Sequence, residues 1–319
     1  MMRISQAKAI ELLKQGEVVA IPTETVYGLA ADARNEEAIS KIYATKQRPA
    51  NNPLIVHIAS AAQVLDWASE FPPLAQKLTQ AFWPGPFTLV LPARKEVSAS
   101  VRAGEPTVAL RVPSHPVALT LLNDSGLGLA APSANKYTQL SPTTAAHVEA
   151  GLGAEVPVLD GGACQVGIES TIVSVHGDEW QLLRPGMIDA SDITAITGKP
   201  AMQQAITHLP KVPGQHLLHY SPRTPCLLFE SRQAMLNYAC NKTAAAALLF
   251  GEGKSVTDKD FVLPNDVALA AEHLYAALHT LDAAQAEIIL IESPPADIAW
   301  DALRDRLQRA TYHPHTQND

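Results

Sequence analysis

Apolar and polar residues alternate in short blocks over residues 1–196, and their spacing predicts helices as well as strands. Between Ser5 and Gly16, apolar residues recur every three or four positions, as in an amphipathic helix that begins at serine and ends at glycine. A second helix is predicted over 35–46. Short apolar runs predict strands at 17–22, 54–58, 87–92, 107–113, 127–132, 170–175 and 180–185, with helical stretches at 60–69, 72–82, 115–123 and 143–150.

This mixture of helices and strands predicts an α/β domain around a large, twisted, mixed sheet in residues 1–196. The next segment, 197–224, is rich in proline and glycine, which predicts a linker. It contains four histidine or tyrosine rings, at His208, His216, His219 and Tyr220. Because a segment of this kind can fold over a pocket and exclude water, we expect it to act as an active-site lid.

Residues 225–319 return to a regular alternation of strand and helix. Strands are predicted at 225–230, 244–250 and 286–292, and helices at 231–241, 267–280 and 297–309. This order predicts a small Rossmann-like α/β domain with a parallel sheet. The stretch GEGKS at 251–255 is interpreted as a turn, because Leu248 stands where a phosphate-binding loop requires glycine.

Composition is that of a globular protein and argues against one large functional class. Hydrophobic residues make up 47% of the chain and charged residues 18%. The net charge of −8 is shared equally, because residues 1–200 hold 15 Lys and Arg against 19 Asp and Glu, and residues 201–319 hold 9 against 13. A protein that binds nucleic acid mainly by neutralising phosphates is expected to be more basic. Any cationic site must therefore be built from a few placed residues.

The sequence also bears on the cellular location of the protein. The N-terminal helix already contains Glu11 and Lys14, which argues against a signal peptide. Apolar runs such as 244–250 are too short to span a bilayer. Cys164, Cys226 and Cys240 lie far apart, without the spacing of a zinc site or a disulfide framework. We therefore expect a soluble, cytoplasmic protein.

Candidate binding residues follow the predicted strands, where open α/β sheets bind ligands. Thr23 follows the first strand, and Arg111 lies inside an apolar one. A buried arginine is costly unless it is paired, so Arg111 should meet either a carboxylate or an anionic ligand, and the sequence favours neither. Lys46 and Arg48 come just before the strand at 54–58. Taken alone, such a K-x-R-P stretch is most often a solvated turn.

Three further segments carry polar residues at predicted strand ends or helix starts. Ser133 and Asn135 lie in APSAN, which in isolation is typical of a turn. The segment SPTT predicts a helix capped by Ser141 or Thr143, and helix N-termini suit phosphate, although a simple cap is the more frequent role. Ser170 and Arg184 complete the set.

These residue types favour one kind of chemistry. Lysine, arginine, serine, threonine and asparagine with few carboxylates fit the positioning and neutralisation of phosphates, whereas acid–base hydrolysis would require paired carboxylates. The eleven histidines show no metal-binding spacing, so no protein metal ligands are predicted. Cys164 could be a nucleophile, but no base for it is identifiable.

Seven segments, taken in order, resemble the YrdC-like family of threonylcarbamoyl-AMP synthases over roughly residues 5–190. They are IPTETVYGLAADA, KIYATKQRPANNPLIVHI, FWPGPFTLVLP, VALRVPSHP, LAAPSANKYTQLSPTTAAHV, GIESTIV and LLRPG. The linker PGQHLLHYSPRTP and the tail resemble the long, two-domain (Sua-type) branch of that family.

The resemblance implies a nucleotidyltransferase that joins L-threonine, bicarbonate or CO2, and ATP into threonylcarbamoyl-AMP, with Mg2+ on the ATP. The product would pass to the machinery that modifies adenosine in tRNA. Lys46 and Arg48 would be catalytic, at the rim of a phosphate pocket, with Lys46 as a mobile charge. ATP would be bound by Lys46, Arg48, Ala50, Thr107, Asn135, Thr143, Arg184 and Tyr220. Threonine would be bound by Thr23, His57, Arg111, Ser133 and Ser170.

Two alternatives remain. The first is a double-stranded RNA-binding module of translation, which the charge of −4 in residues 1–200 disfavours. The second is carbamoyl transfer like that of hydrogenase-maturation proteins with a YrdC-like domain, but this chain lacks the acylphosphatase and zinc-finger regions of those proteins.

Overall fold

The computed structural model describes residues 2–202, 210–214, 218–240 and 244–311. Its internal contacts divide the chain into two compact units. The N-terminal unit comprises Met1–Tyr137 and Pro142–Gln215, and the C-terminal unit comprises Thr138–Ser141 and His216–Asp319. The linker rings predicted at His208 and His216 lie outside the described residues.

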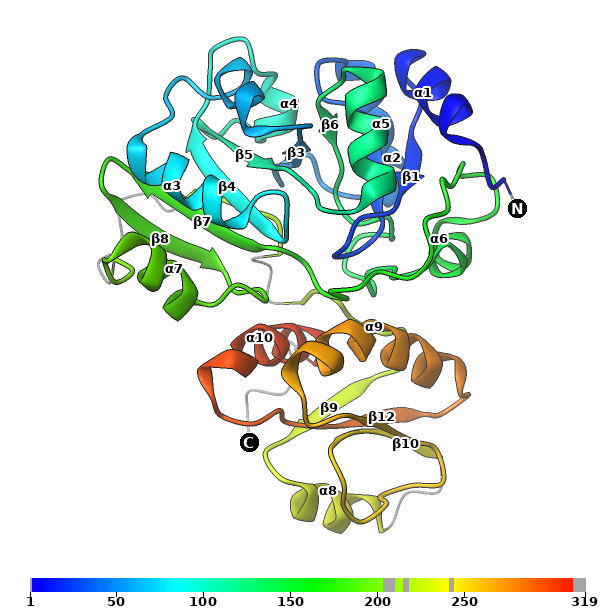
Figure 1. The fold of residues 1–319 in the computed structure, drawn as a ribbon. Helices are drawn as coiled ribbons and strands as arrows, with labels where there is room; N and C mark the ends of the chain where they lie inside the picture. Colours follow the sequence, from blue (N-terminus) through cyan, green and yellow to red (C-terminus); the bar gives the residue numbers. More distant parts are fainter. Residues whose placement is uncertain (1, 203–209, 215–217, 241–243, 312–319) are drawn as a thin grey trace. The chain divides into compact units, whose positions relative to one another are not determined.

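The N-terminal unit is built on an eight-stranded mixed sheet, with the order β1-β2-β6-β3-β5-β4-β7-β8 (Figure 1). The strand pairs β3/β5 and β4/β7 are parallel, and the other neighbours are antiparallel. The strands are β1 (Val19–Ile21), β2 (Gly28–Asp32), β3 (Ile55–His57), β4 (Phe87–Pro92), β5 (Thr107–Arg111), β6 (Leu129–Ala130), β7 (Thr171–His176) and β8 (Glu179–Arg184). The predicted twisted mixed sheet is confirmed.

The helices of this unit cover both faces of the sheet. They are α1 (Gln6–Lys14), α2 (Glu36–Lys46), η1 (Ala61–Asp66), α3 (Pro73–Phe82), α4 (Ala99–Arg102), α5 (Pro116–Ser125), α6 (Ala145–Leu152) and α7 (Ala190–Thr197). Apolar residues of α2, α3 and α4 pack in one cluster with Leu29 and Ala31, whereas α1 and α5 pack with Ala30 in another. Because successive strand residues point to opposite faces, β2 contributes to both layers.

Side-chain caps fix where several helices begin. The Ser5 hydroxyl accepts from the backbone of Lys8, as the sequence predicts. At α6 the predicted cap is wrong. Thr144, not Ser141 or Thr143, has the extended backbone of a cap, and its hydroxyl accepts from His147 N at 3.2 Å. The Thr143 hydroxyl instead lies 3.3 Å from the Nδ1 atom of the same histidine.

The C-terminal unit contains a four-stranded parallel sheet of order β11-β10-β12-β9. The strands are β9 (Cys226–Phe229), β10 (Ala245–Phe250), β11 (Asp260–Leu263) and β12 (Ile288–Glu292), and the helices are α8 (Arg232–Ala239), α9 (Val267–Ala283), η2 (Ile298–Trp300) and α10 (Asp301–Ala310). The parallel α/β fold is confirmed. GEGKS leads from β10 into β11 without a helix, so it is a turn.

A short segment from the middle of the chain belongs to the C-terminal unit. Ser221 N donates to Thr138 O at 2.9 Å, and Gln139 forms a parallel bridge with Ser221. The Nε2 atom of His279, on α9, lies 3.1 Å from the carbonyl oxygen of Ser141. The chain therefore leaves the N-terminal unit after Tyr137 and returns to it at Pro142.

No helix in the described ranges is both long enough and apolar enough to cross a bilayer.

Candidate active site

Polar side chains gather where β1, β3 and β5 end in the N-terminal unit. The turn Thr23–Thr25 follows β1, His57 ends β3, and Arg111 ends β5. His57 and Arg111 are direct partners in the parallel pair β3/β5. All of these side chains are buried, because the sheet is covered on both faces by helices.

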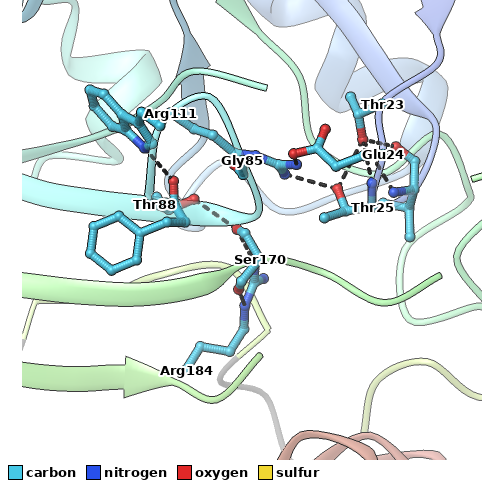
Figure 2. Close-up of polar contacts among 11 residues, drawn as sticks. Thr23, Glu24, Thr25, Gly85, Thr88, Arg111, Ser170 and Arg184 are labelled. Atoms are coloured by element: carbon cyan, nitrogen blue, oxygen red, sulfur yellow. Dashed lines mark hydrogen bonds and ion pairs between the residues drawn. The ribbon is translucent and has the colours of Figure 1, made fainter. Parts of the chain in front are cut away.

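Arg111 makes a different contact with each of its three guanidinium nitrogens. Nε donates to Gly85 O at 3.2 Å, Nη1 donates to Thr25 Oγ1 at 2.9 Å, and Nη2 lies 2.7 Å from Glu24 Oε1. Figure 2 shows Glu24 and Thr25 directed toward Arg111 from the same turn. Of the two partners that the sequence left open, the structure provides the carboxylate.

Charge and burial determine the protonation of this group. Burial alone would raise the pKa of Glu24, but the positive charge of Arg111, together with nearby N–H groups, outweighs burial, and the pKa lies below its usual value. Burial, with the neighbouring Arg111 charge, lowers the pKa of His57 to about 3. At neutral pH Glu24 is therefore a carboxylate and His57 a neutral imidazole.

Thr23 holds the turn that presents Glu24. Its hydroxyl donates to Val26 O at 2.6 Å, accepts from the backbone N–H groups of Thr25 and Val26, and lies 2.9 Å from Thr25 Oγ1. The threonine-binding role predicted for Thr23 is not tested by these contacts. They do show that its side chain fixes the backbone on which the Arg111 partners lie.

Ser170 and Arg184 form a second cluster at the start of β7 and the end of β8. Arg184 donates from Nε and Nη2 to Ser170 O at 3.1 and 2.9 Å, and Nη1 donates to Pro213 O at 3.0 Å. The Ser170 hydroxyl lies 2.7 Å from Thr88 Oγ1 on β4. Both residues are almost fully buried. Figure 2 shows the Arg184 side chain reaching Ser170.

Lys46 corrects one expectation from the sequence. It is 1% exposed, and Nζ donates to Ser133 O at 2.5 Å and to Asn135 O at 2.6 Å. It is therefore a fixed, buried group and not a mobile charge at a rim. The reason is local: α2 ends at Lys46, and Gln47 turns the chain in the left-handed conformation with φ 52°. Burial, and then the nearby Arg48 charge, lower the pKa of Lys46.

The remaining predicted residues lie at more varied positions. Arg48 is buried and its Nη2 donates to Pro53 O at 3.0 Å, whereas Ala50 is exposed. Thr107 begins β5 and is partly buried. Tyr220 belongs to the C-terminal unit, where it is buried against His219 and Tyr275, with Arg306 over its ring. Its role at the nucleotide stays a prediction.

Backbone contacts connect the clusters in the N-terminal unit. Ala134 N, between the two residues that bind Lys46, donates to Tyr27 O at 2.7 Å, next to the Glu24 turn. On the other side, Gly85 binds Arg111, and Thr171 N donates to Pro86 O at 3.0 Å beside Ser170. The lysine, arginine and serine clusters are thus connected through neighbouring backbone segments.

Four contributors were not assigned a site role from the sequence: Glu24, Thr25, Gly85 and Thr88. Glu24 lies between two threonines in a segment of buried residues, and that pattern was a usable signal. A carboxylate there needs a cationic partner as much as Arg111 needs an anionic one. Gly85 contributes a backbone carbonyl and Thr88 a hydroxyl. No sequence pattern distinguishes these groups from the same groups elsewhere in the chain.

The arrangement presents cations and hydroxyls rather than a nucleophile. Burial, and then the Glu24 charge, raise the pKa of Cys164 to about 12, so its thiol stays protonated at neutral pH. Across the described ranges, no group of three or more His, Cys, Asp or Glu side chains could hold a metal ion.

Comparison with known proteins gives consistent similarities. Residues 11–186 match the Sua5/YciO/YrdC family model, described as "Telomere recombination", and residues 188–311 match "Threonylcarbamoyl-AMP synthase, C-terminal domain". The chain is 39% identical to the threonylcarbamoyl-AMP synthase of Bacillus subtilis, over 95% of this chain and 92% of that protein. It is 36% identical to that of Pyrococcus abyssi, over 95% and 93%. The crystal structure of P. abyssi Sua5 complexed with L-threonine superposes with a TM-score of 0.87 at 33% identity, covering 97% of this chain and 95% of that one.

Proposed function

The chain belongs to the Sua5/YciO/YrdC family, and we propose that it is an L-threonylcarbamoyladenylate synthase. The observation that carries the proposal is similarity to threonylcarbamoyl-AMP synthases at 36–39% identity over 95% of the chain. Its substrates would be L-threonine, bicarbonate or CO2, and ATP. Its products would be threonylcarbamoyl-AMP and pyrophosphate, which makes it a nucleotidyltransferase.

The buried clusters supply groups for such a reaction. Arg111 would bind the threonine carboxylate, and Lys46, Arg48 and Arg184 would bind ATP phosphates. Two of the three Lys46 N–H donors bind backbone carbonyls, and we propose that the third reaches a phosphate. The other residues expected from the family resemblance are kept as proposed contacts: Thr23, His57, Ser133 and Ser170 for threonine, and Ala50, Thr107, Asn135, Thr143 and Tyr220 for ATP.

The proposed chemistry has two bond-forming steps. The threonine nitrogen, in its uncharged form, attacks the carbon of CO2; an N–C bond forms, one C=O bond opens to an oxyanion, and the nitrogen releases a proton to water, which gives a carbamate. A carbamate oxygen then attacks the α-phosphorus of ATP, and the bond from that phosphorus to the pyrophosphate oxygen breaks. Alignment of the reactants and neutralisation of phosphate charge by fixed cations would provide most of the acceleration.

Mg2+ would enter with ATP, because magnesium in nucleotide sites is bound largely by substrate phosphates and water. We further propose a cytoplasmic location and transfer of the product to the machinery that modifies tRNA. The alternative of an RNA-binding module is not favoured, because the similarity is to synthases over both units.

Pyrophosphate release from ATP and Mg2+ tests the proposal. Release should require both L-threonine and bicarbonate, and Lys46→Ala and Arg48→Ala should each lower it by about 100-fold or more. Lys41→Ala is the matched control, since Lys41 lies on the same helix but its side chain is 41% exposed and paired with Glu17. Release that is independent of threonine, or absent in folded protein, would contradict the proposal.

A further inference from the structure

The Glu24–Arg111 pair is buried, yet its hydrogen-bonding capacity is incompletely used. Each side chain is 4% exposed. Glu24 Oε1 lies 2.7 Å from Arg111 Nη2, and the backbone N–H groups of Glu24 and Ser114 also act on the carboxylate, but within the described residues no hydrogen bond to either Glu24 oxygen is well aligned. A carboxylate can accept about four hydrogen bonds, and burying one without them is costly. A group left in this state within a polar cluster is expected where a ligand completes it.

The charges around the pair restrict what that ligand can be. Arg111 and Glu24 together carry no net charge, and His57, with a pKa of about 3, adds none at neutral pH. A ligand with a carboxylate alone would leave one buried negative charge without a partner. An α-amino acid carries a carboxylate and an ammonium on the same carbon, so it matches both members of the pair.

Arg111 has N–H donors left with which to bind a ligand carboxylate. Of its five N–H donors, Arg111 donates one to Gly85 and one to Thr25, and a third, on Nη2, faces Glu24 in the ion pair. Two donors therefore remain for a ligand carboxylate. On the other side, the Thr23 turn fixes the backbone of Glu24, so its carboxylate is held in place as a second recognition group.

We propose that Glu24 binds the α-amino group of the amino-acid substrate while Arg111 binds its carboxylate. This inference rests on the proposed function, in which the substrate is L-threonine. Glu24 is then a substrate-binding residue beside the nitrogen that forms the new N–C bond. The pair selects amino acids with an unmodified α-amino group and rejects hydroxy acids of the same shape.

Calorimetric titration at pH 7 with two ligands tests the proposal. The ligands are L-threonine and 2,3-dihydroxybutanoate of the same configuration, which carries a hydroxyl in place of the amino group. The proteins are the wild type, Glu24→Gln and Glu292→Gln. Glu292 is the matched control, because its Oε2 lies 2.6 Å from Arg232 in another largely buried Arg–Glu pair, in the C-terminal unit.

The proposal predicts that Glu24→Gln affects the binding of the two ligands differently. Glu24→Gln should weaken L-threonine binding by about 10- to 100-fold, because a charged hydrogen bond to the ammonium is lost. It should leave 2,3-dihydroxybutanoate binding unchanged or tighter, because Arg111 is no longer neutralised. Glu292→Gln should change neither. If both ligands bind more weakly to Glu24→Gln, Glu24 only positions Arg111; if both bind more tightly, it only competes for Arg111. Either result overturns the proposal.

The wild-type protein provides a test that does not depend on folding of a variant. It should bind L-threonine at least about tenfold more tightly than 2,3-dihydroxybutanoate, and equal affinity would overturn the proposal. Glu24→Asp, which keeps the charge, should retain this preference. Pyrophosphate release separates this inference from the proposed function. If pyrophosphate release depends on threonine but the wild type binds the two ligands equally well, only the role of Glu24 is refuted. If threonine binding depends on Glu24 but no pyrophosphate is released, only the synthase function is refuted.

Discussion

A single lysine joins two sequence motifs that look independent. Lys46 Nζ donates to the backbone carbonyls of Ser133 and Asn135, so the K-x-R and S-x-N segments form one structural element. Removal of Lys46 would therefore displace the second segment as well as delete a charge. Loss of activity in Lys46→Ala measures both effects, and this is why Arg48→Ala is a necessary companion.

His57 is expected to make the folded protein sensitive to mild acid. Its pKa is about 3 when folded and about 6.5 when unfolded, so below pH 6.5 only the unfolded chain gains the proton. Stability should therefore fall as the pH drops from about 6.5 toward 3, by up to about 1.4 kcal/mol per pH unit from this group. His57→Gln should reduce the slope in urea unfolding measured between pH 7 and 4.5.

The surroundings of His57 define the control for this experiment. Burial also lowers the pKa values of His115 and His279, which contribute to the slope with the same sign and persist in the variant. His273→Gln replaces an exposed histidine and should leave the slope unchanged. Equal slopes for wild type and His57→Gln would show that His57 is not held neutral.

The end of α2 places the two proposed catalytic cations. Gln47 adopts φ 52°, and its N–H bonds to carbonyls of the last turn, so α2 ends at Lys46 and Arg48 lies beyond the helix. The two side chains bind different carbonyls, those of Ser133 and Asn135 for Lys46 and that of Pro53 for Arg48. A non-glycine residue is less stable than glycine in this left-handed conformation. Gln47→Gly should raise the free energy of unfolding by up to about 1 kcal/mol and keep activity within about twofold.

Two other substitutions on the same helix test this account. Ala44→Gly, at an exposed position inside α2, should lower the free energy of unfolding by about 1 kcal/mol. Gln47→Val introduces a β-branched residue at positive φ and should lower both stability and ATP affinity. Urea unfolding and ATP titration measure the effects, and stabilisation by Gln47→Val would contradict the argument.

Elements with strong apolar runs were predictable from the sequence, and weak ones were not. The predicted strand at 87–92 coincides with β4, and the helix predicted from Asn35 matches α2. β2 was missed because Gly28–Asp32 consists mostly of small residues and directly continues a turn. β11 was missed because Asp260–Leu263 is a short edge strand with polar neighbours.

The sequence predicted many residues of the candidate site but not the contacts between them. The need of Arg111 for an anionic partner followed from its place in an apolar strand, and the structure meets it. The identity of that partner depends on the turn after β1, which reaches Arg111 although β2, β6 and β3 lie between β1 and β5 in the sheet. No local sequence pattern encodes this approach. The burial of Lys46 likewise depends on carbonyl groups, which the sequence does not reveal.

For the molecule as a whole, Thr138 marks a point where the chain passes between units. It has φ 67°, which is unfavourable for a β-branched residue, and its carbonyl accepts from Ser221 in the C-terminal unit. Such a conformation persists when surrounding contacts impose it. Thr138→Gly should therefore stabilise the full chain by about 1 kcal/mol but give no gain in a fragment of residues 1–214.

Ala103→Gly is the control for this comparison. Ala103 has φ 51° at the end of α4, within the N-terminal unit, so its substitution should stabilise the full chain and the fragment equally. Urea unfolding of the four proteins and their parents provides the data. Equal gains from Thr138→Gly in both backgrounds would show that the C-terminal unit does not impose the conformation.

The membership of residues 138–141 in the C-terminal unit also has a consequence during synthesis on the ribosome. The carbonyl of Ser141 is translated long before its partner His279, 138 residues later in the chain. At synthesis rates of about 5–20 residues per second, that interval is roughly 7–28 s. Nascent chains arrested at increasing lengths should thus acquire protease resistance at 138–141 only after α9 has emerged, because this four-residue segment is made before the rest of the unit to which it belongs.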